Sequence, residues 1–270
     1  MFKLRSFFRK LSLDELYDRQ IRISGVDQGT ISKAQIGIIG VGETGSHVAI
    51  YASRIGIGNI RLCDFDVVEI HNVPRMLGVT LKDVGKNKAE AVANAIRKIG
   101  NGVKAEAYNF DARDLPEEFF HGLDLAIICV DRISTRLEIG ELLWSKGIPH
   151  IDVGTRELLL NIIQILPNRK DWPCMFCMRK IIPKGQLLFS NRSSSCDEKP
   201  IPTILPPGAV ASAIAVNEAL KIITNFKLGK PLDNFLQIDL GNLVFLLLKI
   251  PKDSNCPICG GNSNGEHIEH

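Results

Sequence analysis

Three glycines in the segment IGIIGVGETGSHVA, residues 36–49, have the spacing of a nucleotide-binding loop. Gly40 allows a tight turn, Gly42 leaves bare backbone for a phosphate, and Gly45 lets the following helix pack closely on the preceding strand. The helix that starts there presents free N–H groups to an anion. Asp64 ends the next predicted strand, about 20 residues further on, where an acid meets ribose hydroxyls. The loop therefore predicts a nucleotide site and leaves both NAD and ATP open.

The polar residues around this loop distinguish ATP from NAD. A hydride-transfer site requires an apolar nicotinamide pocket, whereas a triphosphate and its magnesium ion require cations and an acid. The nearby segments supply the second set: Arg19, Asn72, Arg75, Lys88 and Asp131. We therefore expect ATP and Mg²⁺ at this site. Taken singly, each of these residues could equally be an exposed charge or a helix cap.

Two pairs of cysteines have the Cys-x-x-Cys spacing of zinc knuckles. They lie in PCMFC and CPICG and supply Cys174, Cys177, Cys256 and Cys259. Two such knuckles make a tetrahedral Zn²⁺ site with four thiolate ligands, and such a site is structural. A redox role is the alternative, but it would need a separate explanation for each knuckle. We expect zinc to tie the end of the chain to the start of a long loop.

The other cysteines differ in their surroundings. Cys63 and Cys129 lie at the ends of apolar strand patterns, which is typical of buried core residues. Cys196 lies in the polar stretch NRSSSCDEKPIPT, where Arg192 and Lys199 would favour its thiolate. Cys196 is therefore a candidate catalytic residue, and a merely exposed thiol is the alternative.

The elements that would position these residues alternate along the chain between strand and helix patterns. This alternation is the signature of β-α units and a mainly parallel sheet. Strands are predicted over 35–39, 59–63, 103–108, 125–130 and 149–153, and helices over 44–55, 85–99 and 133–146. After Gly154 the segments LLLNIIQIL, NFLQIDL and LVFLLLKI predict antiparallel strands, and 209–223 predicts a helix. The expected fold is α/β: a Rossmann-like, doubly wound, mainly parallel sheet, extended by antiparallel strands and stapled by zinc.

We expect one domain over residues 1–270. Residues 1–33 form a helical arm, in which Ser12 and Glu15 fit a capping box before a helix over 13–23. Residues 34–153 form the nucleotide-binding half. Residues 154–260 hold the antiparallel strands, a crossover loop over 181–207 and the zinc knuckles, and residues 261–270 form a polar tail.

The composition excludes several classes of protein. The chain has 270 residues, 45% of them apolar, and a net charge of +3, which is too weakly basic to indicate a nucleic-acid binder. Its longest apolar runs, 125–130 and 243–248, are far shorter than the roughly 20 residues of a membrane span, and residues 1–10 lack a secretory cleavage pattern. We therefore expect a cytoplasmic protein with neither a nucleic-acid nor a membrane partner.

These motifs, in this order, resemble those of the ThiF/MoeB/HesA superfamily, the ubiquitin-activating-enzyme-like adenylyltransferases. The resemblance covers residues 16–259. It implies that ATP adenylylates the C-terminal carboxylate of a small β-grasp protein ending in Gly-Gly, either a ubiquitin-like or a sulfur-carrier protein. It also implies a homodimer, in which Arg19 reaches the distal phosphates, often those of the neighbouring subunit.

The resemblance gives each candidate residue a role. Asp64 would bind the ribose, Asn72 and Arg75 the phosphates and the reacting centre, Lys88 the triphosphate, and Asp131 the Mg²⁺ ion. Cys196 would accept the acyl group as a thioester or take part in sulfur transfer, although some members of the superfamily only adenylylate.

The chain departs from the superfamily pattern at several positions. Glu43 and Thr44 replace the fourth and fifth residues of Gly-x-Gly-Gly-(Leu/Val)-Gly. An acid beside phosphates is unfavourable unless its side chain turns toward a helix N-terminus. Arg132 replaces an asparagine, Pro74 replaces a glutamine, and the Glu-Gly-Gln segment expected near Leu160 is missing. These departures indicate a divergent subgroup and leave the nucleotide affinity and the carrier protein open.

Three other functions are compatible with parts of the sequence. A relative within the superfamily could adenylylate a small molecule or a tRNA base. An NAD-dependent oxidoreductase would explain the glycine loop and Asp64, but it would leave Arg75, Lys88 and the cysteine knuckles without a task. A zinc-stapled scaffold would bind a nucleotide without turnover.

Overall fold

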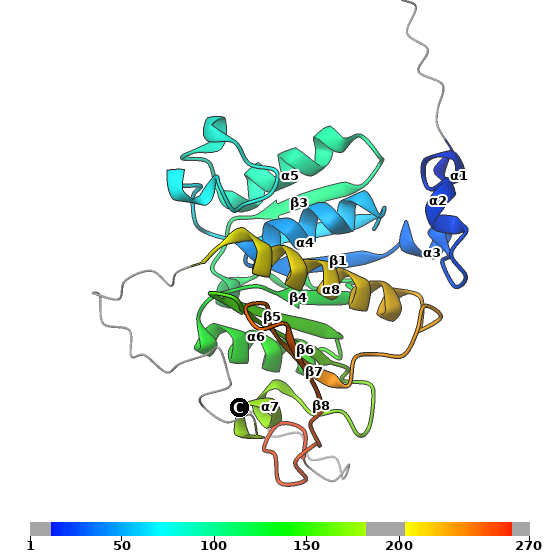
Figure 1. Ribbon diagram of the computed structural model, residues 1–270, viewed down its shortest axis with the longest axis vertical. Coiled ribbons are helices and arrows are strands. Elements are labelled where there is room, and N and C mark those ends of the chain that lie inside the picture. The colour runs from blue at the N-terminus through cyan, green and yellow to red at the C-terminus, as the bar shows by residue number, and fades with distance from the viewer. Residues whose placement is uncertain (1–11, 182–202, 261–270) are drawn as a thin grey trace, which may run out of the picture.

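A single eight-stranded sheet runs through the computed structural model, which describes residues 12–181 and 203–260 (Figure 1). In sheet order the strands are β3 (Lys104–Tyr108), β2 (Asn59–Cys63), β1 (Gln35–Ile39), β4 (Leu125–Ile128), β5 (His150–Arg156), β6 (Leu159–Ile165), β7 (Asn234–Asp239) and β8 (Val244–Lys249). The first five strands in this order are parallel, and each of the last three is antiparallel to its neighbour. The expected parallel sheet with an antiparallel extension is therefore confirmed.

Helices cover both faces of the sheet. On one face lie α4 (Glu43–Arg54), α5 (Lys88–Ile99) and α8 (Leu205–Ile223), with α4 and α8 side by side (Figure 1). On the other face lies α6 (Ile133–Ser145), which contacts α7 (Met175–Ile181). Short helical segments complete the described chain: α1 (Leu13–Leu16), α2 (Asp18–Ile21), α3 (Gln28–Ile31), η1 (Ile70–Asn72), η2 (Leu81–Asp83), η3 (Ala112–Asp114) and η4 (Glu117–Phe119).

Each face of the parallel strands buries its own apolar core, because successive side chains of a strand point to opposite faces. In β1, Ile36 and Ile38 join the core beneath α4, α5 and α8, and Ile39 joins Phe119 in the core beneath α6. These three isoleucines are fully buried. Burial of one such side chain stabilises the fold by roughly 1.5–3 kcal/mol.

The order of the strands creates a crevice between β1 and β4. The helix that follows β1 is α4, on one face, and the helix that follows β4 is α6, on the other face. At such a switch point the chain leaves the two neighbouring strands in opposite directions, and a ligand site opens at their carboxyl ends. The glycine loop lies at this point.

Most of the predicted elements have nearly the predicted bounds. β1 and β2 match them, and α4, α5 and α6 differ by three residues or fewer at either end. β5 continues three residues past Val153, because Gly154, Thr155 and Arg156 pair with β6. α8 begins at Leu205 rather than Ala209, since Pro206 and Pro207 are tolerated in the first turn of a helix.

The predicted helix over residues 13–23 is wrong, although its capping box between Ser12 and Glu15 is confirmed. The segment forms two short helices that meet at Tyr17, whose φ and ψ are −109° and 22°. Tyr17 is buried, and its hydroxyl accepts a hydrogen bond from Asn101. This tertiary contact breaks the helix.

Because His150 in β5 is buried, we expect the free energy of unfolding to fall in acid. The ring is fully buried, Nδ1 lies 3.0 Å from the carbonyl oxygen of Ile148, and burial lowers the pKa of His150 to about 4. The unfolded chain therefore binds a proton at this ring between about pH 6.5 and pH 4, where the folded chain does not. The stabilisation by neutral His150 is complete above about pH 6.5 and falls by roughly 3 kcal/mol as the pH is lowered to 4.

Urea unfolding measured from pH 7 to pH 4.5 tests this prediction. We expect the free energy of unfolding of His150→Leu to fall less over this range than that of the wild type. An equal fall in both proteins would contradict it.

Among the described residues, no helix combines the length and the apolar character that crossing a membrane requires.

Candidate functional site

A cavity of about 540 Å³ opens at the carboxyl ends of β1, β2, β4 and β5. It brings together residues that are far apart in the sequence. Of the predicted site residues, those that line it are Gly40, Gly42, Asp64, Asn72, Arg75, Lys88 and Asp131. The sequence motifs around the glycine loop therefore converge on one site.

The glycine loop holds its shape through close backbone contacts. Gly40 has a φ of +89°, and a Cβ atom there would lie 2.8 Å from the carbonyl group of Cys129. A Cβ atom on Gly45 would collide with the carbonyl oxygen of Gly40. At Gly42, by contrast, a Cβ atom would meet no atom within 4 Å. The first and third glycines thus allow the turn and the helix packing, and the second leaves open space for a ligand.

The first turn of α4 faces this space without a side-chain cap. Its N-cap residue is Gly42, and no side chain accepts a capping hydrogen bond there. The first N–H groups of a helix have no partner within the helix, and the helix dipole gives its N-terminus a partial positive charge. This end of α4 can therefore bind an anion such as a phosphate.

Asp64 at the end of β2 is fixed by two backbone hydrogen bonds. One carboxylate oxygen accepts from Val41 N at 2.7 Å, and the other accepts from Asp66 N at 2.9 Å. Burial raises the pKa of Asp64, whereas these N–H groups and the Lys88 cation lower it. Each oxygen keeps a further lone pair, so the carboxylate can still accept from a hydroxyl group of a ligand.

Lys88 is the first residue of α5, and its side chain lies on the Asp64 side of the cavity. Its Nζ donates to Asp66 Oδ2 at 2.7 Å, and only 13% of its side chain is exposed. Asn87 sets this position, because its Nδ2 donates to the carbonyl oxygens of Asp64 and Asp66 while its Oδ1 caps α5 through Glu90 N. Asn87 was not predicted from the sequence, where its signal is an N-cap asparagine directly before Lys88.

Arg75 also lines the cavity and lies close enough to Glu43 for their charges to interact. Burial raises the pKa of Glu43, and the Arg75 cation is among the groups that lower it again. Asn72 is buried nearby, and its Oδ1 accepts the N–H of Glu69 at 2.9 Å, which closes the turn before Arg75. Lys88 and Arg75 therefore both bring positive charge to the cavity that the glycine loop lines.

Asp131 follows β4 and is exposed at the cavity. The helix after it is anchored by a buried ion pair, in which Arg136 Nη1 lies 2.6 Å from Asp152 Oδ1. The cavity also contains hydroxyl groups of Thr135 and Thr155. Carboxylate and hydroxyl oxygens near a phosphate site form a donor set that suits Mg²⁺.

Further residues that were not predicted from the sequence also line the cavity, among them Phe65, Phe110, Thr155 and Thr203. Phe65 and Phe110 are exposed aromatic residues at the Asp64 end of the cavity. They follow different strands, so no spacing in the sequence relates them. Cys63 and Cys129 also line the cavity but are buried, as expected, and burial raises the pKa of both thiols.

Two predicted site residues are not part of this arrangement. Arg19 in α2 is 89% exposed and lies 3.7 Å from Asp18, and it lines a different hollow at the N-terminal segment. Its role in the site of a second copy stays a prediction. Cys196 lies outside the described residues, as do the basic residues predicted to favour its thiolate.

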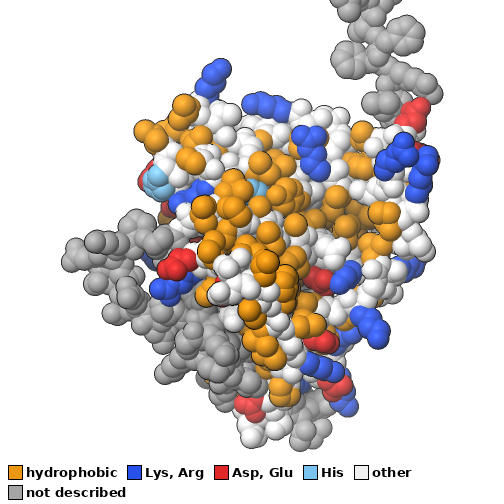
Figure 2. All heavy atoms as spheres, in the orientation of Figure 1, with side chains coloured by type: hydrophobic (Ala, Val, Ile, Leu, Met, Phe, Trp, Pro, Cys, Tyr) orange, Lys and Arg blue, Asp and Glu red, His pale blue; other side chains and the backbone are white. Residues whose placement is uncertain are grey.

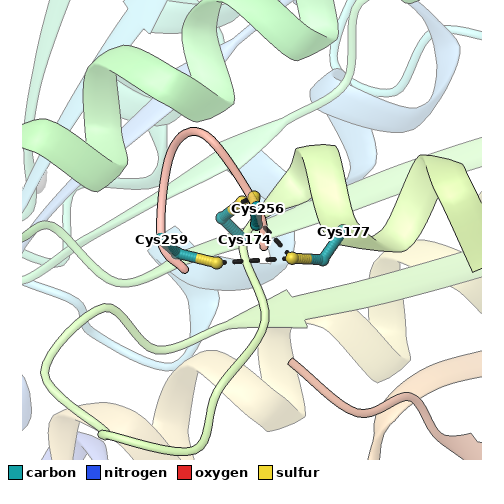
Figure 3. A group of neighbouring side chains, drawn as sticks. All are labelled: Cys174, Cys177, Cys256 and Cys259. Atoms are coloured by element: carbon teal, nitrogen blue, oxygen red, sulfur yellow. Dashed lines mark hydrogen bonds between the residues drawn. The ribbon is translucent and has the colours of Figure 1, made fainter. Parts of the chain in front are cut away.

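The four knuckle cysteines form one buried cluster (Figure 3). Cys174 and Cys177 come from the start of α7, and Cys256 and Cys259 come from the turn that follows β8. All four sulfur atoms lie within 4.8 Å of one another, with Cys177 and Cys259 at 3.3 Å and Cys174 and Cys256 at 3.6 Å. These separations are too long for disulfide bonds, which are about 2 Å.

The geometry of this cluster fits a zinc ion. Zn–S bonds of about 2.3 Å in a tetrahedron place the sulfur atoms roughly 3.8 Å apart. The observed contacts lie close to this value, and the four thiols come from two distant knuckles. The cluster would tie the segment after β8 to α7.

The fold and the cavity define an α/β nucleotide-binding enzyme with its site at the switch point of the sheet. A sequence profile of the ThiF family matches residues 17–258. The chain therefore belongs to the ThiF family and is an adenylyltransferase.

Curated relatives match the chain over nearly its whole length. The molybdopterin-synthase adenylyltransferase of Salmonella typhimurium is 24% identical over 251 residues, which cover 90% of this chain and 95% of the relative. The sulfur carrier protein adenylyltransferase of Thermus thermophilus is 26% identical and covers 90% of both chains. The SAMP-activating enzyme E1 of Haloferax volcanii is 25% identical, with 93% of this chain and 92% of the relative covered.

Solved structures share the fold. Escherichia coli MccB, crystallised with MccA-N7isoASN, superposes with a TM-score of 0.77 at 20% identity and covers 93% of this chain and 76% of MccB. PaaA superposes with a TM-score of 0.75 at 24% identity and covers 91% of this chain and 86% of PaaA.

Proposed function

We propose that this protein uses ATP to adenylylate the C-terminal carboxylate of a β-grasp protein that ends in Gly-Gly, either a ubiquitin-like or a sulfur-carrier protein. The observation that carries the proposal is the cavity that Lys88 and Arg75 line together with an uncapped helix N-terminus. The names of the Salmonella and Thermus relatives support an adenylylation of this kind.

The positive groups of the cavity suit the charges of this reaction. A carboxylate oxygen forms a bond to the α-phosphorus of ATP, and the bond between that phosphorus and the pyrophosphate oxygen breaks. The products are an acyl-adenylate and pyrophosphate. Two unit negative charges 4 Å apart repel each other by about 4 kcal/mol at an effective dielectric constant near 20. Lys88, Arg75 and the N–H groups of α4 would offset this repulsion and stabilise the departing pyrophosphate.

The remaining lining residues would hold the rest of the nucleotide. Asp64 would accept hydrogen bonds from the ribose, and Phe65 and Phe110 would contact the adenine ring at the same end of the cavity. Asp131 would hold a Mg²⁺ ion, which when bound adds positive charge beside the polyphosphate. Adenylylation itself requires no nucleophilic side chain of the protein.

An exposed apolar strand offers a surface for the carrier protein. β8 is the edge strand, and Val244, Phe245, Leu247 and Leu248 are exposed on its two faces. Figure 2 shows apolar side chains gathered in a band over α8 and β8. β8 is the third strand beyond β5, which borders the cavity, and three inter-strand spacings amount to about 14 Å. An extended tail of about five residues spans roughly 17 Å and reaches the cavity from there.

Three further features complete the proposal. The protein acts as a homodimer, in which Arg19 contributes to the site of the neighbouring subunit. Cys196 takes the activated acyl group as a thioester or takes part in sulfur transfer. The cysteine cluster holds a structural Zn²⁺ ion.

ATP/pyrophosphate exchange with candidate β-grasp proteins tests this function. We expect exchange with a carrier that ends in Gly-Gly, and none with the same carrier lacking its last two residues. Exchange that proceeds with a small molecule or a tRNA and with no protein carrier would overturn the proposed substrate. ATP binding without any exchange would overturn the proposed activity.

A further inference from the structure

Glu43, the acid that departs from the superfamily loop, does not point at the anion-binding turn. Its Oε2 accepts a hydrogen bond from the hydroxyl of Thr203 at 2.5 Å. Its other oxygen packs against α8, where a Cβ atom on Gly208 would lie 2.5 Å from Oε1. Within the described residues, this buried Oε1 has no hydrogen-bond partner. The carboxylate is therefore wedged between the first turns of α4 and α8.

A second contact fixes the same two helices. Ser212 Oγ in α8 donates to the carbonyl oxygen of Thr44 at 2.9 Å. This bond joins α8 to α4 one residue after Glu43. It therefore helps to fix the position of the Glu43 carboxylate relative to the Thr203 hydroxyl. If the Glu43 side chain only had to point away from the phosphates, it would not need a hydrogen bond from Thr203.

The hydrogen bond to Glu43 determines what Thr203 can offer a ligand. A threonine hydroxyl has one donor hydrogen and two acceptor lone pairs. The hydrogen of Thr203 is directed at Glu43 Oε2, and an ionised carboxylate can only accept. Burial raises the pKa of Glu43, whereas the hydrogen bond from Thr203 and the Arg75 cation lower it, so this bond itself favours the ionised form that accepts it. Thr203 lines the cavity, where it therefore presents an acceptor and no donor.

Thr203 lies on the side of α4 away from Asp64, because it lies just before α8, which packs against α4 and over β4, β5 and β6. The strand order β2-β1-β4-β5 places Asp64, the glycine loop, Asp131 and Thr155 in that sequence along the edge of the sheet. Asp64 marks the nucleoside end. The other end, at Thr155 and Thr203, is the place left for the chain that carries the reacting carboxylate.

We propose that Thr203, held as an acceptor by Glu43, binds the backbone N–H of the terminal residue of the acyl substrate. This inference rests on the proposed function and deepens it, because it names the chemical group that is recognised. The site would select a peptide tail with a free N–H next to its terminal carboxylate. It would discriminate against a terminal N-alkylated residue, which cannot donate this bond.

The test compares two semisynthetic carriers that differ only at the last residue, which is glycine or N-methylglycine. For the wild type we expect a kcat/KM in pyrophosphate exchange about tenfold higher with the glycine carrier, the value of one hydrogen bond. Thr203→Val should lose this preference and keep the KM for ATP, whereas Thr203→Ser should restore the preference. Glu43→Gln should weaken it, because an amide can itself donate to Thr203.

The outcomes separate this inference from the proposed function. Exchange with equal kcat/KM for both carriers in the wild type, or an undiminished preference in Thr203→Val, would overturn the inference and leave the function standing. Absence of exchange with every carrier would overturn both.

Discussion

We expect the replacement of Lys88 by alanine to lower the rate of ATP/pyrophosphate exchange by about 10²- to 10³-fold, the usual effect of removing one group that stabilises developing charge. The loss is large because the Lys88 Nζ sits in the cavity on the Asp64 side of the glycine loop, with only 13% of its side chain exposed. Its present partner is Asp66, which is half exposed, so the ion pair itself contributes little to stability. The variant should therefore fold like the wild type and bind ATP more weakly.

Lys86→Ala is the matched control for this variant. Lys86 lies two residues earlier, pairs with Asp83 at 2.8 Å and does not line the cavity. Its loss removes the same charge from the same segment, and exchange should stay within a few-fold of the wild-type rate. Arg75→Ala should act like Lys88→Ala, because Arg75 lines the same cavity. Full exchange activity in both Lys88→Ala and Arg75→Ala would refute the assignment.

We expect that replacing Cys177 by serine abolishes the proposed zinc binding and lowers the free energy of unfolding by at least about 4 kcal/mol. The side chain is fully buried between α7 and the segment after β8, and its sulfur lies 3.3 Å from that of Cys259. Without the metal, the three remaining buried thiols are left with weak mutual contacts, and the C-terminal turn loses its attachment to α7.

Metal analysis and urea unfolding measure this effect, with Cys63→Ala as the control. Cys63 is also a buried cysteine, but it donates to the carbonyl oxygen of Phe110 and lies outside the cluster. We expect one zinc per chain in the wild type and in Cys63→Ala, and none in Cys177→Ser. A wild-type protein purified without chelator that contains no zinc would contradict the proposal.

The strands and the main helices were predictable because their signals are local. β1 and β2 are short, mainly apolar runs. A glycine directly follows β1 and an aspartate directly follows β2, so their bounds can be predicted from the sequence. The Cys-x-x-Cys spacing likewise predicted which sulfur atoms meet. The break at Tyr17 was not predictable, because it depends on Asn101, which is 84 residues away.

The candidate site was predictable in its motifs but not in its full lining. Gly40, Asp64 and Lys88 follow strands or begin helices, and the topology of the fold brings these positions together. Phe110 and Thr203 enter the same cavity from segments without a motif. The direction of the Glu43 side chain depends on α8, which lies some 160 residues later. Tertiary packing alone decides such contacts.

A crystal structure with a non-hydrolysable ATP analogue tests the central claim most directly. We predict that the polyphosphate lies over Gly42 at the first turn of α4, that Lys88 Nζ leaves Asp66 to contact a phosphate oxygen, and that Arg75 also contacts the polyphosphate. A polyphosphate bound elsewhere, with Lys88 still paired to Asp66, would contradict the account.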